Sequence, residues 1–439
     1  AQLFARSAWA ASQAGETVER LRFCIEGLTQ VGEAPDGPGL ARLLHETARA
    51  YADHALREKG EPFARRALAM AERLGDVEVQ ALALVTMSIF LYASPEESIA
   101  MAARAVELAE AHELLVAGQR AHLHLAWRIT AHRGASAGWI HYRQGAELAR
   151  QAGLTAAQIH ILAQMVHKLL YCGKLEESQQ TLCRLRVLLE DLHEPTRARL
   201  SLLDSELRYL AAAGQWEACA QQARPILASM RERGPIRDLA LFALLLGWAI
   251  LESRRLGSAP HAGEWQEAEA ALAEATGILD RSLAPTYGIW TRVAWGFLCV
   301  CQGRLCDARQ LLAEANEVAM VMHWPPSMEG QRLWLEGQVA AAGEEWAESI
   351  DWFESACRAL SDAGHRWYCA RVRLDWAQAH SSRGQPGDRQ RAAELLREAR
   401  DAFQDMGVPR YAAIAQERLQ ALGAEPLIPV ERASSNASG

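Results

Sequence analysis

The sequence lacks a long hydrophobic run and an excess of positive charge. Its most apolar segment, residues 239–251, spans 13 residues, whereas a membrane-spanning helix needs about 20, so we expect no membrane span. The 46 basic residues are outnumbered by 54 acidic ones, and the net charge is −8. Because nucleic-acid contacts need clustered cations, we expect no direct binding of nucleic acid.

Paired cysteine motifs and a secretory segment are missing as well. The nine cysteines include no C-x-x-C pair, and residues 1–14 have no basic start followed by an apolar core. This cysteine usage is typical of a reduced protein, and we expect a cytoplasmic location. What is present is a core-forming composition, 50% hydrophobic and 23% charged, which excludes a wholly disordered chain.

Motifs that carry chemistry are also absent from the sequence. There is no G-x-x-x-x-G-K-[ST] loop, no G-x-G-x-x-G after a strand and no H-E-x-x-H pair. His160 and His167 are two helical turns apart, too far to share a metal ion without a third ligand. The clustered Cys299, Cys301 and Cys306 are most simply read as small apolar residues. We therefore expect no enzyme, no cofactor and no metal site.

A short pattern recurs along the chain: glycine, any residue, a large apolar residue, two further residues and a small one. The large residues, which we call anchors, are separated by 41, 49, 40 and 41 positions. The anchors are Leu175, Trp216, Trp265, Leu305 and Trp346. The one long interval contains residues 256–264, a Gly/Pro/Ser-rich stretch that we interpret as an inserted loop. Weaker copies near positions 17, 63, 95, 135 and 389 indicate about ten units.

Each unit has the periodicity of two helices. After the anchor, small and large side chains alternate in steps of three and four, as in residues 305–315, which places them on one helix face. A small residue precedes most anchors, and it is Gly247, Gly296 or Gly337 in three units. Because a glycine inside a helix costs about 1 kcal/mol, we expect each to contact the second helix of its hairpin. No segment alternates with a period of two, so we expect no strand.

Together these positions resemble the tetratricopeptide repeat (TPR), with its small, glycine and large residues in the same order. The period of about 40 rather than 34, and the missing closing proline, depart from that family. Longer units of this kind are similar to the helical sensor arms of bacterial signal-transduction ATPases with numerous domains (STAND ATPases), such as the arm of the maltose-regulon activator. Residues 391–424 look like the terminal hairpin and capping helix of those regulators. The resemblance implies a sensor arm.

The repeat predicts an all-α fold, a right-handed superhelical α-solenoid of about ten TPR-like helix hairpins. One hairpin cannot bury its apolar face alone, so each is completed by its neighbours. We expect the solenoid to cover residues 1–423, including a terminal capping helix. Residues 424–439 predict a disordered tail or a linker, and the abrupt start suits a fragment of a longer chain.

The first helix of each unit is expected to line the concave wall of the superhelix. Residues 15, 11 and 8 positions before the anchors share a helix face and are mostly polar, and several tryptophans lie near the same wall. Because Trp and Arg dominate binding hot spots, these residues are our candidate ligand contacts. They are Arg120, His124, Trp127, His160, Gln164, His167, Asp204, Arg208, Trp248, Trp290, Gln331, Trp334, Gln338, Arg371, Asp375 and Gln378. The alternative is that the wall is merely solvated and the tryptophans belong to the core.

Two functions are compatible with this pattern. The first is a non-catalytic sensor domain of a larger signal-transduction ATPase or transcriptional regulator. It would bind a protein, peptide or small-molecule effector in the groove and relay its presence to an ATPase module in the same longer chain. The alternative is a constitutive protein–protein scaffold or adaptor of the TPR type.

Overall fold

The computed structural model describes residues 1–14, 16–32, 35–54, 56–91, 94–190, 192, 196–233, 236–257, 263–280, 285–321 and 326–423. Within these ranges the chain forms 21 α-helices and no strand. Consecutive helices pair as ten hairpins, and α21 (Pro409–Ala421) follows the last hairpin. The first helices of the hairpins are α1 (Gln2–Ala14), α3 (Pro38–Asp53), α5 (Val77–Phe90), α7 (Leu115–Arg133), α9 (Thr155–Tyr171), α11 (Thr196–Ala212), α13 (Ile236–Leu256), α15 (Pro285–Cys301), α17 (Pro326–Ala342) and α19 (Arg366–Arg383). The second helices are α2 (Thr17–Val31), α4 (Arg57–Leu74), α6 (Pro95–Ala111), α8 (Trp139–Gln151), α10 (Leu175–Glu190), α12 (Trp216–Arg233), α14 (Glu264–Leu279), α16 (Leu305–Val321), α18 (Trp346–Asp362) and α20 (Asp388–Asp405).

The repeat anchors mark the starts of second helices. Leu175, Trp216, Leu305 and Trp346 are the first residues of α10, α12, α16 and α18, and Trp265 is the second residue of α14. The sequence period therefore corresponds to one helix hairpin, as predicted.

The glycine two positions before an anchor makes the turn between the two helices of a hairpin. Gly173, Gly214 and Gly303 have φ angles of 76°, 78° and 74°, in the left-handed region that glycine enters without a Cβ penalty. In the hairpin of α17 and α18 this position is Glu344, with φ of 59°. The turn geometry is therefore kept where the glycine is shifted to the neighbouring position.

Glycines inside first helices allow close approach of a neighbouring helix. A Cβ at Gly337 would lie 2.7 Å from the ring of Phe353 on α18, and Gly247 faces α14 in the same way. Both contacts lie within one hairpin, as expected. Gly296 differs, because its nearest neighbour is the Leu335 side chain on α17 of the next hairpin. The expectation of a contact within the hairpin is wrong there, since α15 and α17 pack directly against each other.

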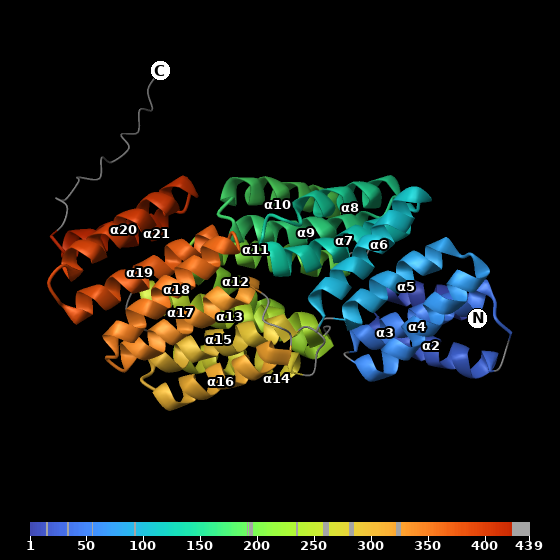
Figure 1. Cartoon of the computed structure of the whole chain (residues 1–439), viewed down its shortest axis with the longest axis horizontal. Coiled ribbons are helices and arrows are strands. Elements are labelled where there is room, and N and C mark those ends of the chain that lie inside the picture. Colours follow the sequence, from blue (N-terminus) through green and yellow to red (C-terminus); the bar gives the residue numbers. More distant parts are fainter. Residues whose placement is uncertain are drawn as a thin grey trace, which may run out of the picture.

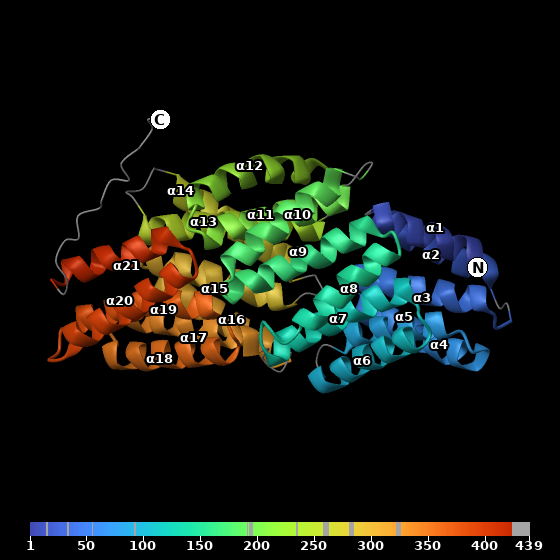
Figure 2. The same cartoon turned by 90° about the horizontal axis from the view of Figure 1, so that it is seen from above.

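The stack of hairpins completes about one superhelical turn in five hairpins. Helix α7 contacts α17 and α9 contacts α19, so first helices five hairpins apart touch. Similarly, Arg197 on α11 donates to the carbonyl oxygen of Ser12 on α1, at 3.5 Å. The backbone N–H of Ala135 donates to the carbonyl of Ala363, at 2.9 Å, and joins the turn after α7 to the turn after α18. Figures 1 and 2 show the C-terminal hairpins folded back beside the middle of the chain. The inner wall therefore meets itself along part of its length.

The predicted all-α solenoid of TPR-like hairpins is confirmed by this arrangement. The predicted tail, residues 424–439, and residues 258–262 of the predicted inserted loop lie outside the described residues. Over the described part of the chain, no helix combines the length and the apolarity that a bilayer crossing requires.

Candidate functional site

The structure divides the candidate wall residues between two regions. In the C-terminal half, on α11 to α19, aromatic and charged side chains of opposing walls pack against one another. In the N-terminal half, on α7 and α9 with α3 nearby, charged side chains have fewer protein partners.

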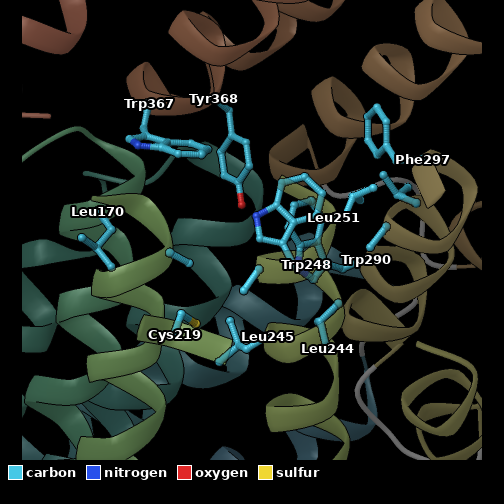
Figure 3. Close-up of a cluster of buried hydrophobic side chains, with 14 of the residues drawn as sticks. Leu170, Cys219, Leu244, Leu245, Trp248, Leu251, Trp290, Phe297, Trp367 and Tyr368 are labelled. Carbon is cyan, nitrogen blue, oxygen red and sulfur yellow. The ribbon is translucent and has the colours of Figure 1, made fainter. Parts of the chain in front are cut away.

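Three of the tryptophans predicted as ligand contacts are packed in the interior of the C-terminal half. Trp248, Trp290 and Trp334 are at most 8% exposed. The Trp248 ring lies 5.2 Å from that of Trp290 and 6.1 Å from that of Trp334. Tyr368, from α19 on the opposing wall, packs edge-on against Trp290 at 5.6 Å, and Figure 3 shows it directed toward this pair. Such aromatic packing stabilises a fold, so these tryptophans have protein partners.

Arg371 and Asp375 belong to a buried ion network with Glu252 and Arg255. Arg371 Nε donates to Glu252 at 2.7 Å, and its Nη1 lies 3.0 Å from Asp375. Asp375 also accepts from Arg255, at 2.6 Å, and from the indole N–H of Trp334, at 2.8 Å. Burial alone would lower the pKa of Arg371, but Asp375 and Glu252 raise it above its ordinary value. Two guanidinium groups therefore form ion pairs with two carboxylates, and the charge of Arg418 also acts on this network.

His167, Asp204 and Arg208 form a second paired group, on α9 and α11. Asp204 lies 3.0 Å from His167 Nε2 and 3.0 Å from Arg208 Nε. Burial and the nearby Arg208 lower the pKa of His167 to about 4, although Asp204 opposes the shift. The imidazole is therefore neutral at pH 7, and Asp204 accepts hydrogen bonds from both neighbours. Burial alone would raise the pKa of Asp204, but Arg208 and His167 lower it.

Arg120, His124, Trp127 and His160 come together in the N-terminal half. The Trp127 ring lies 4.8 Å from that of His124 and 6.1 Å from that of His160. His160 Nδ1 is 3.3 Å from the hydroxyl of Ser201 on α11. His124 is buried, whereas Arg120, Trp127 and His160 keep part of their surface exposed. These four candidates therefore share one region that solvent reaches.

Five arginines lie in or beside this region, and two carboxylates interact with three of them, Arg20, Arg49 and Arg120. Both carboxylates are engaged by one arginine: Arg20 contacts Glu46 and Asp53, at 2.6 Å each. Asp53 also lies 3.8 Å from Arg49. Burial lowers the pKa of Arg49 to about 10. The charge of Asp53 opposes this shift, and the charges of neighbouring arginines add to it. We call this set the arginine cluster; it consists of Arg20, Arg49, Arg120, Arg128 and Arg197.

Arg128 is the member of the arginine cluster whose charge is least compensated by carboxylates. It lies one helical turn after His124 on α7, and its charge lowers the pKa of that histidine. Burial lowers the pKa of Arg128 to about 10, and no neighbouring carboxylate raises it. Its guanidinium forms no ion pair with any carboxylate among the described residues, although part of the side chain is exposed.

Three N–H groups on this part of α7 are buried and have no acceptor among the described residues. They are Nδ1 of His124, Nε1 of Trp127 and Nε of Arg128. Burial and the surrounding basic groups lower the pKa of His124 well below 6.5, so its ring is neutral at pH 7. Its Nε2 accepts from Arg49, at 3.4 Å, which leaves the proton on Nδ1. Every unsatisfied atom of the three is a donor, and buried donors without partners destabilise a fold.

The four predicted glutamines differ in their exposure. Gln331 is 3% exposed, while Gln164 and Gln338 are half-buried. Gln378 is exposed, and its side-chain amide donates to the hydroxyl of Ser382 at 3.3 Å. A ligand contact at any of these four positions stays a prediction.

The sequence analysis missed Arg49 and Arg128 because the weak repeat copies were placed a few residues out of register. The copy near position 135 belongs to α8, which begins at Trp139, and the copy near 63 belongs to α4, which begins at Arg57. Counting 11 residues back from Trp139 gives Arg128, and counting 8 back from Arg57 gives Arg49. With the correct helix starts the same rule gives both residues, but from Trp139 it gives positions 124, 128 and 131 and no longer Arg120 or Trp127.

The N-terminal region therefore offers positive charge and hydrogen-bond donors. Across the described residues, no group of three or more His, Cys, Asp or Glu side chains is placed to hold a metal ion. The chemistry that this region can perform is binding of a group rich in acceptors.

Comparison with known proteins gives structural likenesses at low sequence identity. No protein-family model and no curated protein matches the chain. Among solved structures, it is similar to a Rap protein complexed with the competence and sporulation factor (TM-score 0.49, 11% identity, covering 87% of this chain and 97% of that one). It is also similar to a STAND protein with a tetratricopeptide repeat sensor from Pyrococcus horikoshii (TM-score 0.41, 10% identity, 93% and 54%). A third likeness is to the APC/C hetero-tetramer Cut9–Hcn1 (0.34, 10%, 96% and 93%). This chain spans about half of the STAND protein, and none of these likenesses is a basis for assigning a ligand.

Proposed function

We propose that this chain is a non-catalytic binding arm that takes up an effector at its N-terminal inner wall and serves as a sensor in a larger signal-transduction ATPase or transcriptional regulator. The observation that supports the proposal is the contrast between the two halves. Arg208 and Arg371 on the C-terminal wall form ion pairs within the protein. Arg128 forms none among the described residues, and it lies beside the unsatisfied donors of His124 and Trp127. An effector that supplied acceptors would satisfy groups that the fold leaves unsatisfied.

The winding of the stack offers a route by which binding could be relayed. Helix α7 carries the three donors and also contacts α17, five hairpins further on. An effector that favoured one position of α7 over another would shift the arrangement of both helices, which is what coupling requires.

A thermal-shift titration of the purified chain with peptides and metabolites tests this function. We expect an effector at 100 times its Kd to stabilise the chain by about 2.7 kcal/mol, and we expect Arg128→Gln to reduce that gain. Arg358→Gln is the matched control, since Arg358 lies on α18 with a 69% exposed side chain, away from the arginine cluster.

Two results would contradict the sensor proposal. One is a chain that no compound stabilises and whose Arg128→Gln variant leaves the response of the longer protein unchanged. The other is a constant protein partner that is captured equally well with and without effector. That second result would support the scaffold alternative.

A further inference from the structure

We propose that the N-terminal inner wall binds a small ligand carrying a multivalent oxyanion, either a phosphate ester or a polycarboxylate. The inference rests on the proposed function and names the chemical class of its effector. It is carried by the balance of charge, the kind of hydrogen-bonding groups left over, and the neighbours of those groups.

The charge balance of this region is positive although the chain as a whole carries −8. Three guanidinium groups, those of Arg20, Arg49 and Arg120, interact with Glu46 or Asp53, and Arg20 contacts both carboxylates at 2.6 Å. Arg120 and Arg128 form no ion pair within the part of the chain that the structure describes. A multivalent anion would supply the missing negative charge, and the forked guanidinium group matches carboxylate and phosphate oxygens.

The leftover hydrogen-bonding groups point to the same class. Nδ1 of His124, Nε1 of Trp127 and Nε of Arg128 are donors, and the unsatisfied Thr130 hydroxyl on the same helix can donate as well as accept. An oxyanion offers only acceptors, so it can satisfy such a set without introducing donors of its own. Amides and hydroxyls, by contrast, bring N–H and O–H groups that this part of the wall has no free carboxylate to accept.

Aromatic rings flank the cationic groups and indicate what the rest of the ligand contacts. Trp127 is adjacent to Arg128 in the chain and lies edge-on to His160, at 6.1 Å. Both rings keep part of their surface exposed. A ligand whose charged end meets Arg120 and Arg128 would place its uncharged part against these rings.

A buried arginine of the C-terminal half, Arg371, provides a comparison for Arg128. Arg371 is fully buried, and Glu252 and Asp375 lie within 3.0 Å of it. Arg371 therefore has one carboxylate partner from its own helix, α19, and one from the facing α13. Arg128 is surrounded by protein atoms to the point that its pKa falls to about 10, yet it has no such partner.

Calorimetric titration of the whole chain tests the inference. The probes are pyrophosphate and citrate at constant ionic strength, with sodium chloride as the reference, so that a phosphate and a polycarboxylate source are separated. We expect saturable binding of at least one probe, and about tenfold weaker binding in Arg128→Gln and in Arg120→Gln. Arg128→Lys should show an intermediate loss of affinity, because lysine keeps the charge but lacks the bidentate guanidinium group. Arg358→Gln should bind as the wild type does.

Equal binding in the wild type and in both Gln variants, or no binding of either probe, would overturn the inference. These results leave the proposed function open, because a neutral peptide could still act as effector. Conversely, probe binding that depends on Arg128, in a longer protein whose output ignores the probe, would support the anion site and reject the sensor.

Discussion

The inner wall of this solenoid has two parts that treat charge in opposite ways. In the C-terminal half, Glu252, Arg255, Arg371 and Asp375 neutralise one another between helices that lie on opposing walls. In the N-terminal half, the arginine cluster outnumbers its carboxylates. The same kind of helix lines both parts, and α7 contacts α17 just as α9 contacts α19. The difference therefore lies in which side chains face one another: carboxylates face Arg255 and Arg371, whereas none pairs with Arg128 among the described residues.

The largest effect should come from breaking the buried ion network. We expect Arg371→Ala to lower the free energy of unfolding by about 3–5 kcal/mol, because it leaves the carboxylate of Glu252 buried without its partner. Urea unfolding followed by circular dichroism measures this loss. Arg358→Ala, on an exposed ion pair, is the control and should have little effect. An Arg371 variant as stable as the control would mean that the two walls do not differ as described.

Packing within the hairpins should be equally tight in both halves. We expect Gly337→Ala and Gly60→Ala each to destabilise the chain by about 1–3 kcal/mol. The reason is that the new Cβ would lie 2.7 Å from the Phe353 ring in one case and 2.9 Å from the Tyr51 side chain on α3 in the other. Thermal unfolding is the measurement.

Gly277 on α14 provides the matched control, since a Cβ there would meet nothing within 4 Å. Gly277→Ala should stabilise the helix by about 0.5–1 kcal/mol. If Gly60→Ala behaved like Gly277→Ala, the N-terminal hairpins would be loosely packed, and the contrast between the halves would extend beyond the inner wall.

Acid should weaken both halves through buried histidines. Burial lowers the pKa of His45 and of His365 to about 3. Below pH 6.5 the unfolded chain binds a proton at each site that the folded chain does not. The free energy of unfolding therefore decreases as the pH is lowered, by up to about 1.4 kcal/mol per pH unit per histidine. Urea unfolding between pH 7 and pH 4 should show a shallower slope in His45→Gln and in His365→Gln. A slope that changes in only one variant would show that burial is unequal in the two halves.

The smallest effect should come from the arginine cluster itself. In buffer free of multivalent anions, we expect Arg128→Gln to change the free energy of unfolding by no more than about 0.5 kcal/mol, or to raise it slightly, because no carboxylate loses a partner. The same urea assay applies. If Arg128→Gln lowered the free energy of unfolding as much as Arg371→Ala, Arg128 would have a protein partner, and the two halves of the wall would not differ in charge pairing.

Much of the fold could be predicted from the sequence because it is encoded locally. The spacing of Leu175, Trp216, Leu305 and Trp346 reports helix starts directly, since a turn with a left-handed residue must precede each one. The small positions on first helices report close helix packing for the same reason. Both signals depend on residues a few positions apart.

The winding of the stack could not be predicted in this way. It results from a small rotation between successive hairpins that adds up over five of them, and no short motif encodes it. The partner of Arg371 is Glu252, 119 residues away, so the pairing is visible only once the walls have met. For this reason the sequence analysis grouped Trp248 and Arg371 with Arg120, although the structure places them in surroundings of a different kind.

The hydrogen bond from the Trp216 indole to the Tyr411 hydroxyl, at 3.2 Å, joins residues 195 positions apart, and Trp367 reaches the carbonyl of Ala212 across 155. An open stack of hairpins can fray from its ends one unit at a time, because each unit touches only its neighbours. Here the final helix is fastened to the middle of the chain, so loss of the last hairpin would uncover the aromatic interior of hairpins near the centre. Melting of the C-terminal half is therefore a collective event, because its last helices cover side chains of hairpins near the middle of the chain.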